Sequence, residues 1–315
     1  MGIVKTTRMA LLIMPLGIFM NISLASATPF TLGDFDTYGL LVNDGAANGD
    51  INTAPVNANI GVGTITGKVN LHNEVVNGKV DASGNAADVV AGGNITGTQP
   101  VSRGGASPSG SPASVNSNVA AVESAITTAK ALSNTYGAEA ASGTPVTING
   151  TTTINASAGF LDASGARLFT ASGFSIGNGH TVTINGSPTE YVVIDVTGNS
   201  GNKLDGALTL TGGITPNQVL INFIGSGGAV QGAANGATLQ GTFLIPNEKV
   251  QLNSLTIVGH LFGGAAGQDF QFVSNALMAQ PLTAVPEPTT LLLGATGLVA
   301  LGVWGRKRLF GKAAV

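Results

Sequence analysis

Short apolar runs separated by small polar residues recur along most of the chain. Each run is three to seven residues long and rich in Val, Ile, Leu, Thr and Phe, and Gly, Asn, Asp or Pro interrupts the pattern between runs. Short runs of β-branched residues bounded by turn residues are typical of strands. The pattern therefore predicts a mainly β protein; the runs include TPVTINGTTTIN, HTVTING, EYVVIDV, ALTLTGG, VLINFIG and VQLNSLTIVGHLF.

The spacing of these runs favours a solenoid of stacked coils. The element TING occurs at residues 147–150 and again at 183–186, although no single period covers the whole chain. Frequent short strands with small turn residues are typical of stacked coils, and a β-sandwich is the alternative. In a solenoid a narrow interior would hold one stripe of apolar side chains, here Leu239, Phe243, Ile245, Leu252 and Ile257.

One segment has a helical period instead. Apolar residues from Val115 to Tyr136 follow the spacing of a single helical stripe, which predicts one helix over about 115–136 that packs on the β body. Ser114 or Ser117 is expected to cap its start, and Gly137 to end it in a left-handed conformation. The preceding residues 98–114 are rich in Gly, Ser and Pro and are predicted to form a flexible surface loop.

The start of the chain has the order of a secretory signal peptide. Lys5 and Arg8 precede an apolar stretch that ends in Ala25-Ser26-Ala27. A charged region, an apolar region and small residues in this order predict cleavage after Ala27, with Thr28 first in the mature chain. Residues 1–27 are therefore expected to direct export through the Sec translocon.

The end of the chain combines a motif, an apolar span and a basic cluster. Residues 289–305 contain no charge and are just long enough to cross a bilayer as a transmembrane helix. Arg306, Lys307 and Arg308 follow and would remain on the cytoplasmic side. Val285-Pro286-Glu287-Pro288 precedes the span, which leaves everything before it outside the membrane.

These C-terminal features resemble the PEP-CTERM sorting signal of Gram-negative bacteria, over residues 285–315. The resemblance implies recognition by an exosortase and removal of the tail. It also implies an inner-membrane-attached precursor whose product reaches the cell surface or the extracellular matrix. A retained tail that anchors the protein permanently is the alternative.

Composition limits the function classes further. Charged residues are 9% and aromatic residues 5% of the chain, so a thick globular core is not expected. The chain has no cysteine, which excludes a disulfide framework and a thiol nucleophile. Residues 28–284 carry 7 Lys and Arg against 15 Asp and Glu, a formal net charge of −8 that argues against nucleic acid as a partner.

The order of elements in residues 28–284 carries a second resemblance. GDFDTYGLLV and VVAGGNITG come first, the helix follows, and VLINFIG and GTFLIPNEKVQLNSLTIVGHLFGG come last. This order resembles the choice-of-anchor A domain of bacterial surface proteins and, more distantly, ice-binding-like β-solenoid adhesins. The resemblance implies a right-handed parallel β-solenoid with one flanking α-helix.

Candidate catalytic chemistry is sparse. His72, His180 and His260 have no metal-ligand spacing and are expected at the surface or in turns, with His72 and Glu74 as a minor metal alternative. No nucleophile elbow occurs. Asp195 and Asp205 are the best isolated carboxylates for a polysaccharide-modifying enzyme, although both fit turn capping. We therefore assign no catalytic residue, expect no cofactor and favour a protein that is not an enzyme.

Two acidic stretches near the N-terminus are candidates for calcium. Asp34 and Asp36 lie two residues apart, and Asp44 and Asp50 lie in a glycine-rich stretch. Carboxylate oxygens are the ligands that calcium prefers. Neither stretch matches a known calcium loop, and Asp is also an ordinary turn residue, so the turn interpretation is preferred and no metal is expected.

Paired threonines suggest one further activity. The pairs Thr151 and Thr153, Thr181 and Thr183, and Thr209 and Thr211 have the spacing of side chains on one side of a strand. Stacked strands would turn such pairs into a flat hydroxyl face of the kind that ice binding requires, but the pairs recur at irregular separations. We therefore interpret the chain as an exported adhesive or structural protein of the biofilm matrix with exopolysaccharide as its expected partner, and keep ice binding and polysaccharide modification as alternatives.

Overall fold

The computed structural model describes most of the chain between its two terminal segments. The described residues lie within Thr28–Val285. They are 29–52, 58–66, 69–71, 75–76, 80–83, 89–91, 94–95, 115–273 and 277–278.

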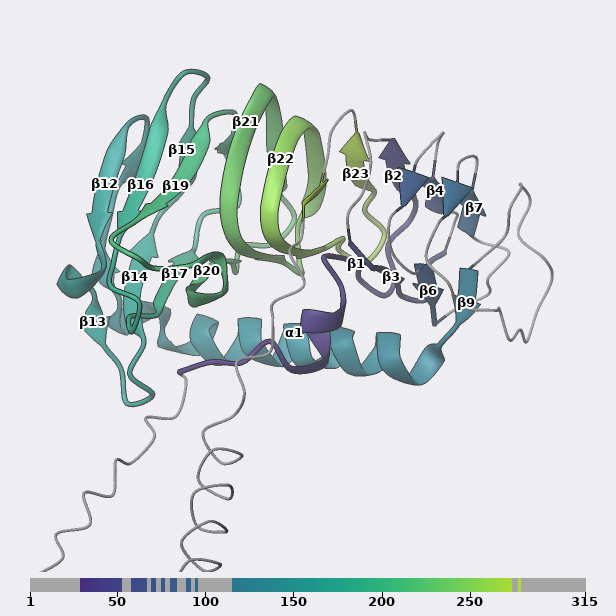
Figure 1. Cartoon of the computed structure of the whole chain (residues 1–315), viewed down its shortest axis with the longest axis horizontal. Coiled ribbons are helices and arrows are strands. Elements are labelled where there is room, and N and C mark those ends of the chain that lie inside the picture. The colour runs from purple at the N-terminus through teal and green to yellow at the C-terminus, as the bar shows by residue number, and fades with distance from the viewer. Residues whose placement is uncertain are drawn as a thin grey trace, which may run out of the picture. The chain divides into compact units, whose positions relative to one another are not determined.

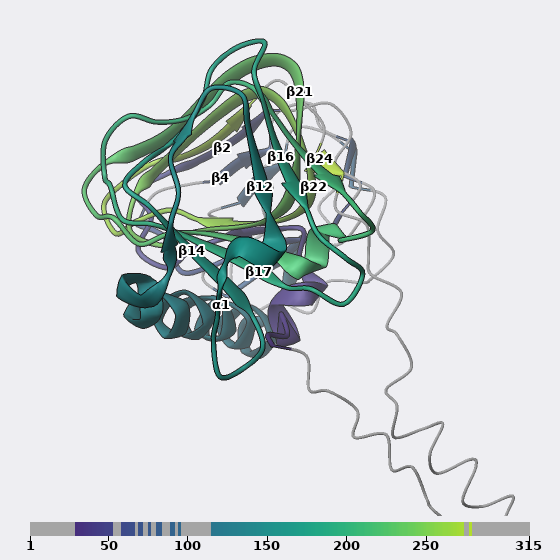
Figure 2. The ribbon, with the colours of Figure 1, turned by 90° about the vertical axis from the view of Figure 1, so that its left-hand side faces the viewer.

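The described part of the chain is a coil of parallel strands with three sides (Figure 2). Neighbouring coils pair through three parallel ladders, which we call ladders A, B and C, and the outward surface of each is face A, B or C. The long strands β21 (Ala229–Ile245) and β22 (Lys249–Gly263) bend around the corners and take part in all three ladders. Ladder A otherwise contains β10 (Thr144–Pro145), β14 (Arg167–Ala171), β17 (Val192–Val196), β20 (Val219–Phe223), β1 (Leu40–Val42), β3 (Ile60–Val62), β6 (Val80–Ala82) and β9 (Val115–Ser117).

Ladders B and C complete each coil. Ladder B contains β11 (Ile148–Asn149), β15 (Phe174–Ile176), β18 (Asn202–Leu204), β23 (Phe270–Val273), β2 (Gly49–Asn52), β4 (Val69–Leu71) and β7 (Val89–Ala91). Ladder C contains β12 (Thr152–Asn155), β16 (Thr181–Asn185), β19 (Ala207–Thr211) and β24 (Leu277–Met278). Three short strands of the described residues lie outside the three parallel ladders. β13 (Phe160–Leu161) pairs antiparallel with β14, and β5 (Val75–Val76) pairs with β8 (Asn94–Ile95).

The N-terminal coils stack on the C-terminal coils. β1 lies between β22 and β3, and β2 lies between β23 and β4, so the first and last described parts of the chain share a sheet. The chain then has to reach the opposite end of ladder A, from β9 to β10. The helix α1 (Val119–Glu139) makes this connection and runs along face A (Figure 1).

The length of α1 matches the width of sheet that it covers. A helix of 21 residues spans about 31 Å. The helix contacts β6 near one end and β17 near the other, and the strands from β6 to β17 are separated by roughly 29 Å at the usual strand spacing. A second short element, the 3-10 helix η1 (Gly33–Thr37), packs against α1; the remaining 3-10 turns are η3 (Ala140–Ser142), η4 (Ala156–Ala158) and η5 (Pro216–Gln218).

The boundaries of the helix differ from those expected. Val115–Ser117 forms β9 in place of the first helical turn, because pairing with β6 satisfies its backbone. Asn118 is the N-cap residue, so neither predicted serine caps the helix. Gly137 lies inside α1, and its lack of a side chain allows the close approach of Ile224, since an added Cβ would lie 2.9 Å from Ile224 Cγ2.

The predicted parallel solenoid with one flanking helix is confirmed, and the β-sandwich alternative is wrong. All the ladder pairings are parallel, which a sandwich of antiparallel sheets does not produce. The five residues expected inside the coil are all buried, as are the stripe residues Val122, Ile126, Ala129 and Tyr136 of α1, whereas Val119 is half exposed.

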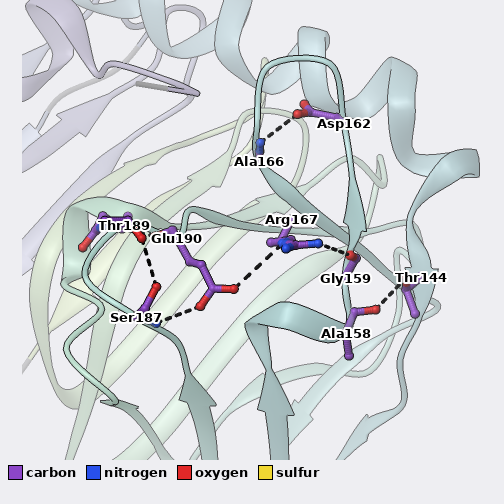
Figure 3. Close-up of polar contacts among 10 residues, drawn as sticks. Thr144, Ala158, Gly159, Asp162, Ala166, Arg167, Ser187, Thr189 and Glu190 are labelled. Atoms are coloured by element: carbon purple, nitrogen blue, oxygen red, sulfur yellow. Dashed lines mark hydrogen bonds and ion pairs between the residues drawn. The ribbon is translucent and has the colours of Figure 1, made fainter. Parts of the chain in front are cut away.

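Polar contacts hold together the coils that directly follow α1 (Figure 3). The Arg167 side chain lies between Glu190, with Nε and Oε1 3.9 Å apart, and the carbonyl of Gly159, to which Nη1 donates. Glu190 also accepts a hydrogen bond from the Ser187 backbone N–H at 2.8 Å. Asp162 accepts one from the Ala166 N–H at 2.7 Å, and the hydroxyl of Thr144 donates to the carbonyl of Ala158. These contacts fix loops at one end of the solenoid.

Candidate ligand-binding faces

Over much of its length face A is covered by α1, so its outward side chains are not accessible to a ligand. Its outward residues Leu168, Val193 and Leu220 lie in one register row, and all three are buried with the apolar residues of α1. Because successive side chains of a strand point to opposite sides, these residues would face water if the helix were absent. Face A is therefore a folding interface, and ligand-binding residues have to be sought on faces B and C.

Face C carries the three threonine pairs of the sequence, and the parallel register brings them together. Thr153, Thr183 and Thr209 occupy one row across β12, β16 and β19. The neighbouring row contains Thr211, paired with Asn185 of β16. Irregular separations in the sequence thus become a regular array in space, because the loops at the corners of the coils take up the differences in length.

Hydrogen bonds connect these side chains across the strands. The hydroxyl oxygens of Thr183 and Thr209 lie 3.3 Å apart. In the next row, Asn185 Nδ2 donates to Asn155 Oδ1 at 3.2 Å, and the Thr211 hydroxyl donates to Asn185 Oδ1 at 3.2 Å. These contacts hold neighbouring side chains in fixed orientations.

The array continues onto the long strands. Thr238 of β21 is paired with Thr256 of β22. Leu208 of β19 is paired with Leu239 of β21, so the residues before them, Ala207 and Thr238, lie side by side in one row. The outward residues along this face are uncharged and either half-buried or exposed, as the centre of an open sheet requires. The rows are Thr181–Ala207–Thr238–Thr256, Thr153–Thr183–Thr209–Gln240–Val258 and Asn155–Asn185–Thr211.

Face B has a different chemistry. Its central outward row includes Ser175, Lys203, Gln231, Gln251 and Gln271, in register across five coils. A groove of about 370 Å³ lies along part of this row. Face B therefore combines amide and cationic groups with the carboxylate of Asp50, which pairs with Gln271, whereas the rows of face C named above contain no charged side chain.

The first calcium candidates are engaged in protein contacts. Asp34 accepts a hydrogen bond from the hydroxyl of Ser124 on α1, and Asp36 Oδ1 lies 3.3 Å from His260 Nε2. His260 itself is 1% exposed, with Nδ1 2.9 Å from the carbonyl oxygen of Tyr38. The prediction of a surface or turn position for this histidine is wrong, because the residue lies beneath the segment that covers face A.

The other two calcium candidates lie apart from the first two. Asp44 Oδ1 accepts a hydrogen bond from the Thr64 N–H at 2.8 Å, and Oδ2 lies 3.7 Å from Lys130 Nζ. Asp50 lies on β2 of ladder B, opposite Gln271. Within the described residues no group of three or more acidic, histidine or cysteine side chains has the geometry of a metal site. His72 and Glu74 lie outside those residues.

Asp195, the best carboxylate for an enzyme, is buried between ladder A and α1. Its Oδ1 accepts a hydrogen bond from Asn222 Nδ2 at 2.7 Å, and Asn222 in turn bonds Ser133 of the helix. Burial raises the pKa of Asp195 to about 6, and the charge of Glu139 acts in the same direction against the effect of the Asn222 hydrogen bond. A carboxylate with no exposed surface cannot meet a polymer substrate, so this residue belongs to the interior. Asp205 is partly exposed and accepts a hydrogen bond from the Ala233 N–H at 2.7 Å.

The sorting residues lie beyond the described part of the chain. Ala25, Ala27, Thr28, the Val285–Pro288 motif, the span at 289–305 and the Arg306–Arg308 cluster are all outside it, as is the expected loop at 98–114. In the portion of the chain that the structure describes, no helix is long and apolar enough to cross a membrane.

Comparison with known families identifies the two parts of the chain. Residues 284–308 match the PEP-CTERM protein-sorting motif, so the solenoid belongs to a protein exported to the cell surface through the exosortase system of Gram-negative bacteria. The fold and the sorting motif together define an exported protein with a β-solenoid domain. Residues 25–272 match the model of the ice-binding-like adhesive domain, and the chain belongs to this family. The description of the family names an adhesive domain and does not specify the choice-of-anchor A type, which stays a prediction.

Several solved structures are similar to this chain at low sequence identity. A glycosylated ice-binding protein from an Arctic yeast is 15% identical, with a TM-score of 0.48, over 84% of this chain and 97% of that one. An ice-binding protein from the Antarctic ascomycete Antarctomyces psychrotrophicus is also 15% identical, with a TM-score of 0.46, over 79% and 98% of the two chains. A domain of an ice-binding protein from Shewanella frigidimarina is 16% identical, with a TM-score of 0.42, over 79% and 96%. No curated protein matches the chain in sequence.

Proposed function

We propose that this protein is an exported adhesive that binds ice through the threonine rows of face C. The observation that carries the proposal is the register of β12, β16 and β19, which places Thr153, Thr183 and Thr209 in one row with further Thr and Asn side chains on both sides. Membership in the ice-binding-like adhesive family supports it.

The array has the repeat that a crystalline ligand requires. Neighbouring strands lie about 4.8 Å apart, and alternate residues of one strand lie roughly 6.6 Å apart, so the hydroxyl groups repeat in two directions. Threonine is stiff at χ1, and its hydroxyl and methyl groups therefore keep their positions at little cost in entropy. A surface ordered in this way before binding suits a ligand that is itself ordered and rigid.

The absence of charge from the named rows of face C supports the same ligand. Ice offers neutral hydrogen-bonding groups, so a charged side chain on the contact surface would lose hydration without gaining a partner. Face B carries Lys203 and Asp50 in its central row and is less suitable for this reason.

The sorting signals determine where such a protein would act. In this proposal the Sec translocon exports the chain, cleavage after Ala27 releases residues 1–27, and an exosortase acts at Val285–Pro288. The span at 289–305 and the Arg306–Arg308 cluster would hold the precursor in the inner membrane until that step. The solenoid would then act at the cell surface or in the exopolysaccharide matrix, where it would attach cells or matrix to ice.

A substitution in the middle of face C tests the proposal. Thr183→Tyr places a bulky ring at the centre of the array on a strand that tolerates aromatic residues. We expect the inhibition of ice recrystallisation to fall at least about tenfold, which corresponds to ~1.4 kcal/mol of binding. Ser175→Tyr on face B is the matched control and should leave the activity unchanged. Wild-type protein that has no effect on ice growth, or a Thr183→Tyr variant as active as wild type, would overturn the proposal.

A further inference from the structure

The groove on face B lies where three glutamine side chains form a ladder. Gln231 Nε2 donates to Gln251 Oε1 at 3.0 Å, and Gln251 Nε2 donates to Gln271 Oε1 at 3.1 Å. The three residues are in register on β21, β22 and β23. Gln231 and Gln251 each use one amide N–H in this ladder and keep a second for a ligand. The result is a row of oriented donors and acceptors that repeats about every 4.8 Å.

The hollow beside this row has a structural cause. Ala233 lies two residues after Gln231 on β21, is exposed, and lines the groove with only a methyl group. The pairing of β21 with β22 then shifts register between Ala233 and Ala237, where β21 contains extra residues. The small side chain of Ala233 beside this β-bulge leaves room at this corner of the coil, and bulges often accompany binding sites.

Charged groups lie at one end of the groove. Lys203 is exposed next to Gln231 and forms no ion pair with any residue in the described ranges. Asp205 is held by its hydrogen bond from the Ala233 N–H. Asn253, which is exposed on β22 and paired with Ala233, adds an amide beside the ladder. The groove is therefore open and is lined by polar and apolar groups together, with the polar groups held in place by strand register and hydrogen bonds.

We propose that this groove binds a segment of a neutral, extended glycan across β18, β21, β22 and β23. Each sugar hydroxyl is both a donor and an acceptor, as is each glutamine amide, so a polyhydroxyl chain can satisfy the free hydrogen-bonding groups of the ladder. An acidic polymer is disfavoured because residues 28–284 carry a net charge of −8 and Asp205 borders the site. The inference does not rest on the proposed function, since it concerns another face of the coil.

Binding of two hexasaccharides to the full-length chain tests the inference. The probes are cellohexaose, which is neutral, and hexagalacturonic acid, which has the same length and is acidic. The chain is kept in an amine-oxide detergent that contains no sugar, and binding is measured by calorimetry. We expect cellohexaose to bind and hexagalacturonic acid to bind at least about tenfold more weakly, a difference of ~1.4 kcal/mol.

Variants locate the site. Gln251→Leu keeps the side chain's bulk but interrupts the ladder, and should weaken cellohexaose binding at least about tenfold. Asn253→Ala removes an exposed amide at the same site and serves if the first variant does not fold. Ser175→Leu, on the same face but outside the residues that line the groove, is the matched control. Thr183→Tyr should keep full cellohexaose binding whatever its effect on ice, which separates this inference from the proposed function.

Three results would overturn the inference. The first is no binding of cellohexaose by the wild-type chain at millimolar concentration, the second is tighter binding of the acidic hexasaccharide, and the third is wild-type affinity in both Gln251→Leu and Asn253→Ala.

Discussion

Faces A and C are built from the same coils, but face A is covered by α1 whereas face C is open. Both contribute inward Val, Ile, Leu and Phe side chains to one core. Their outward rows differ, because face A presents Leu168, Val193 and Leu220 whereas face C presents Thr153, Thr183 and Thr209. The apolar rows require a cover, which α1 supplies, and the hydroxyl rows do not. The difference indicates that the outward row determines whether a side of this solenoid is covered or left open.

The largest expected effect is the loss of an outward aromatic side chain on face A. Phe262 is fully buried beneath η1, with its ring 6.2 Å from the Phe35 ring in an edge-to-face arrangement. Phe262→Ala should lower the free energy of unfolding by about 3–5 kcal/mol, as for other large-to-small changes in a core. Denaturant unfolding measures the change. Thr183→Ala on face C is the comparison and should stay within ~0.5 kcal/mol; equal losses in both variants would contradict the assignment of the faces.

The buried carboxylate of face A should make stability depend on pH. The pKa of Asp195 is raised from 3.8 to about 6 in the folded protein, so the folded state binds its proton more tightly than the unfolded state does. Stability should then be highest while the group is protonated, fall as pH rises between about 4 and 6, and stay level above that range. Asp195→Asn should remove this fall and stabilise the protein at pH 7 by up to about 3 kcal/mol. Thermal unfolding between pH 4 and 7 gives the profile, and an unchanged slope in the variant would show that another group is responsible.

The polar contact between α1 and face A should have a smaller effect. Ser133 Oγ donates to Asn222 Oδ1 at 2.6 Å, and both residues are buried. Ser133→Ala leaves the Asn222 oxygen without this donor and should cost about 1–2 kcal/mol. Asn134→Ala at the adjacent exposed position controls for the higher helix propensity of alanine. If the two variants unfold at the same denaturant concentration, the contact does not stabilise the interface.

The smallest effect on stability is expected on face C. Thr209→Ala removes the hydroxyl that lies 3.3 Å from the Thr183 hydroxyl, at a partly exposed site. Stability should change by less than about 0.5 kcal/mol, whereas the inhibition of ice recrystallisation should decrease measurably. A variant that loses stability but keeps its activity on ice would contradict the proposal that face C binds ice and contributes little to stability.

The sequence was sufficient to predict the inside of the coil but not its outside. Leu239 and Ile257 were correctly placed in the core, because an alternating apolar pattern identifies the inward side of a strand without knowledge of its partners. The stripe of α1 was recognised for a similar reason. The ends of α1 could not be predicted from the sequence, because the pairing of Val115–Ser117 with β6 and the packing of Gly137 on Ile224 are tertiary effects.

The candidate sites depend on register, which one sequence does not reveal. Thr153 and Thr183 are 30 residues apart and Thr183 and Thr209 are 26 apart, so no constant period marks the row. The threonine pairs were nevertheless visible as a hydroxyl pattern. The glutamine ladder had no comparable signal, since Gln231, Gln251 and Gln271 stand among unrelated neighbours, and their separation of 20 residues gains meaning only from the pairing of β21, β22 and β23.

Partition into slowly growing ice tests the central claim most directly, namely that face C is the surface that binds ice. Wild-type protein, Thr183→Tyr and Gln251→Leu are each frozen slowly from dilute solution, and the protein in the ice and in the remaining liquid is quantified. We expect wild type and Gln251→Leu to be concentrated in the ice and Thr183→Tyr to remain in the liquid. Incorporation of Thr183→Tyr at the wild-type level, or exclusion of the wild-type protein, would contradict the account.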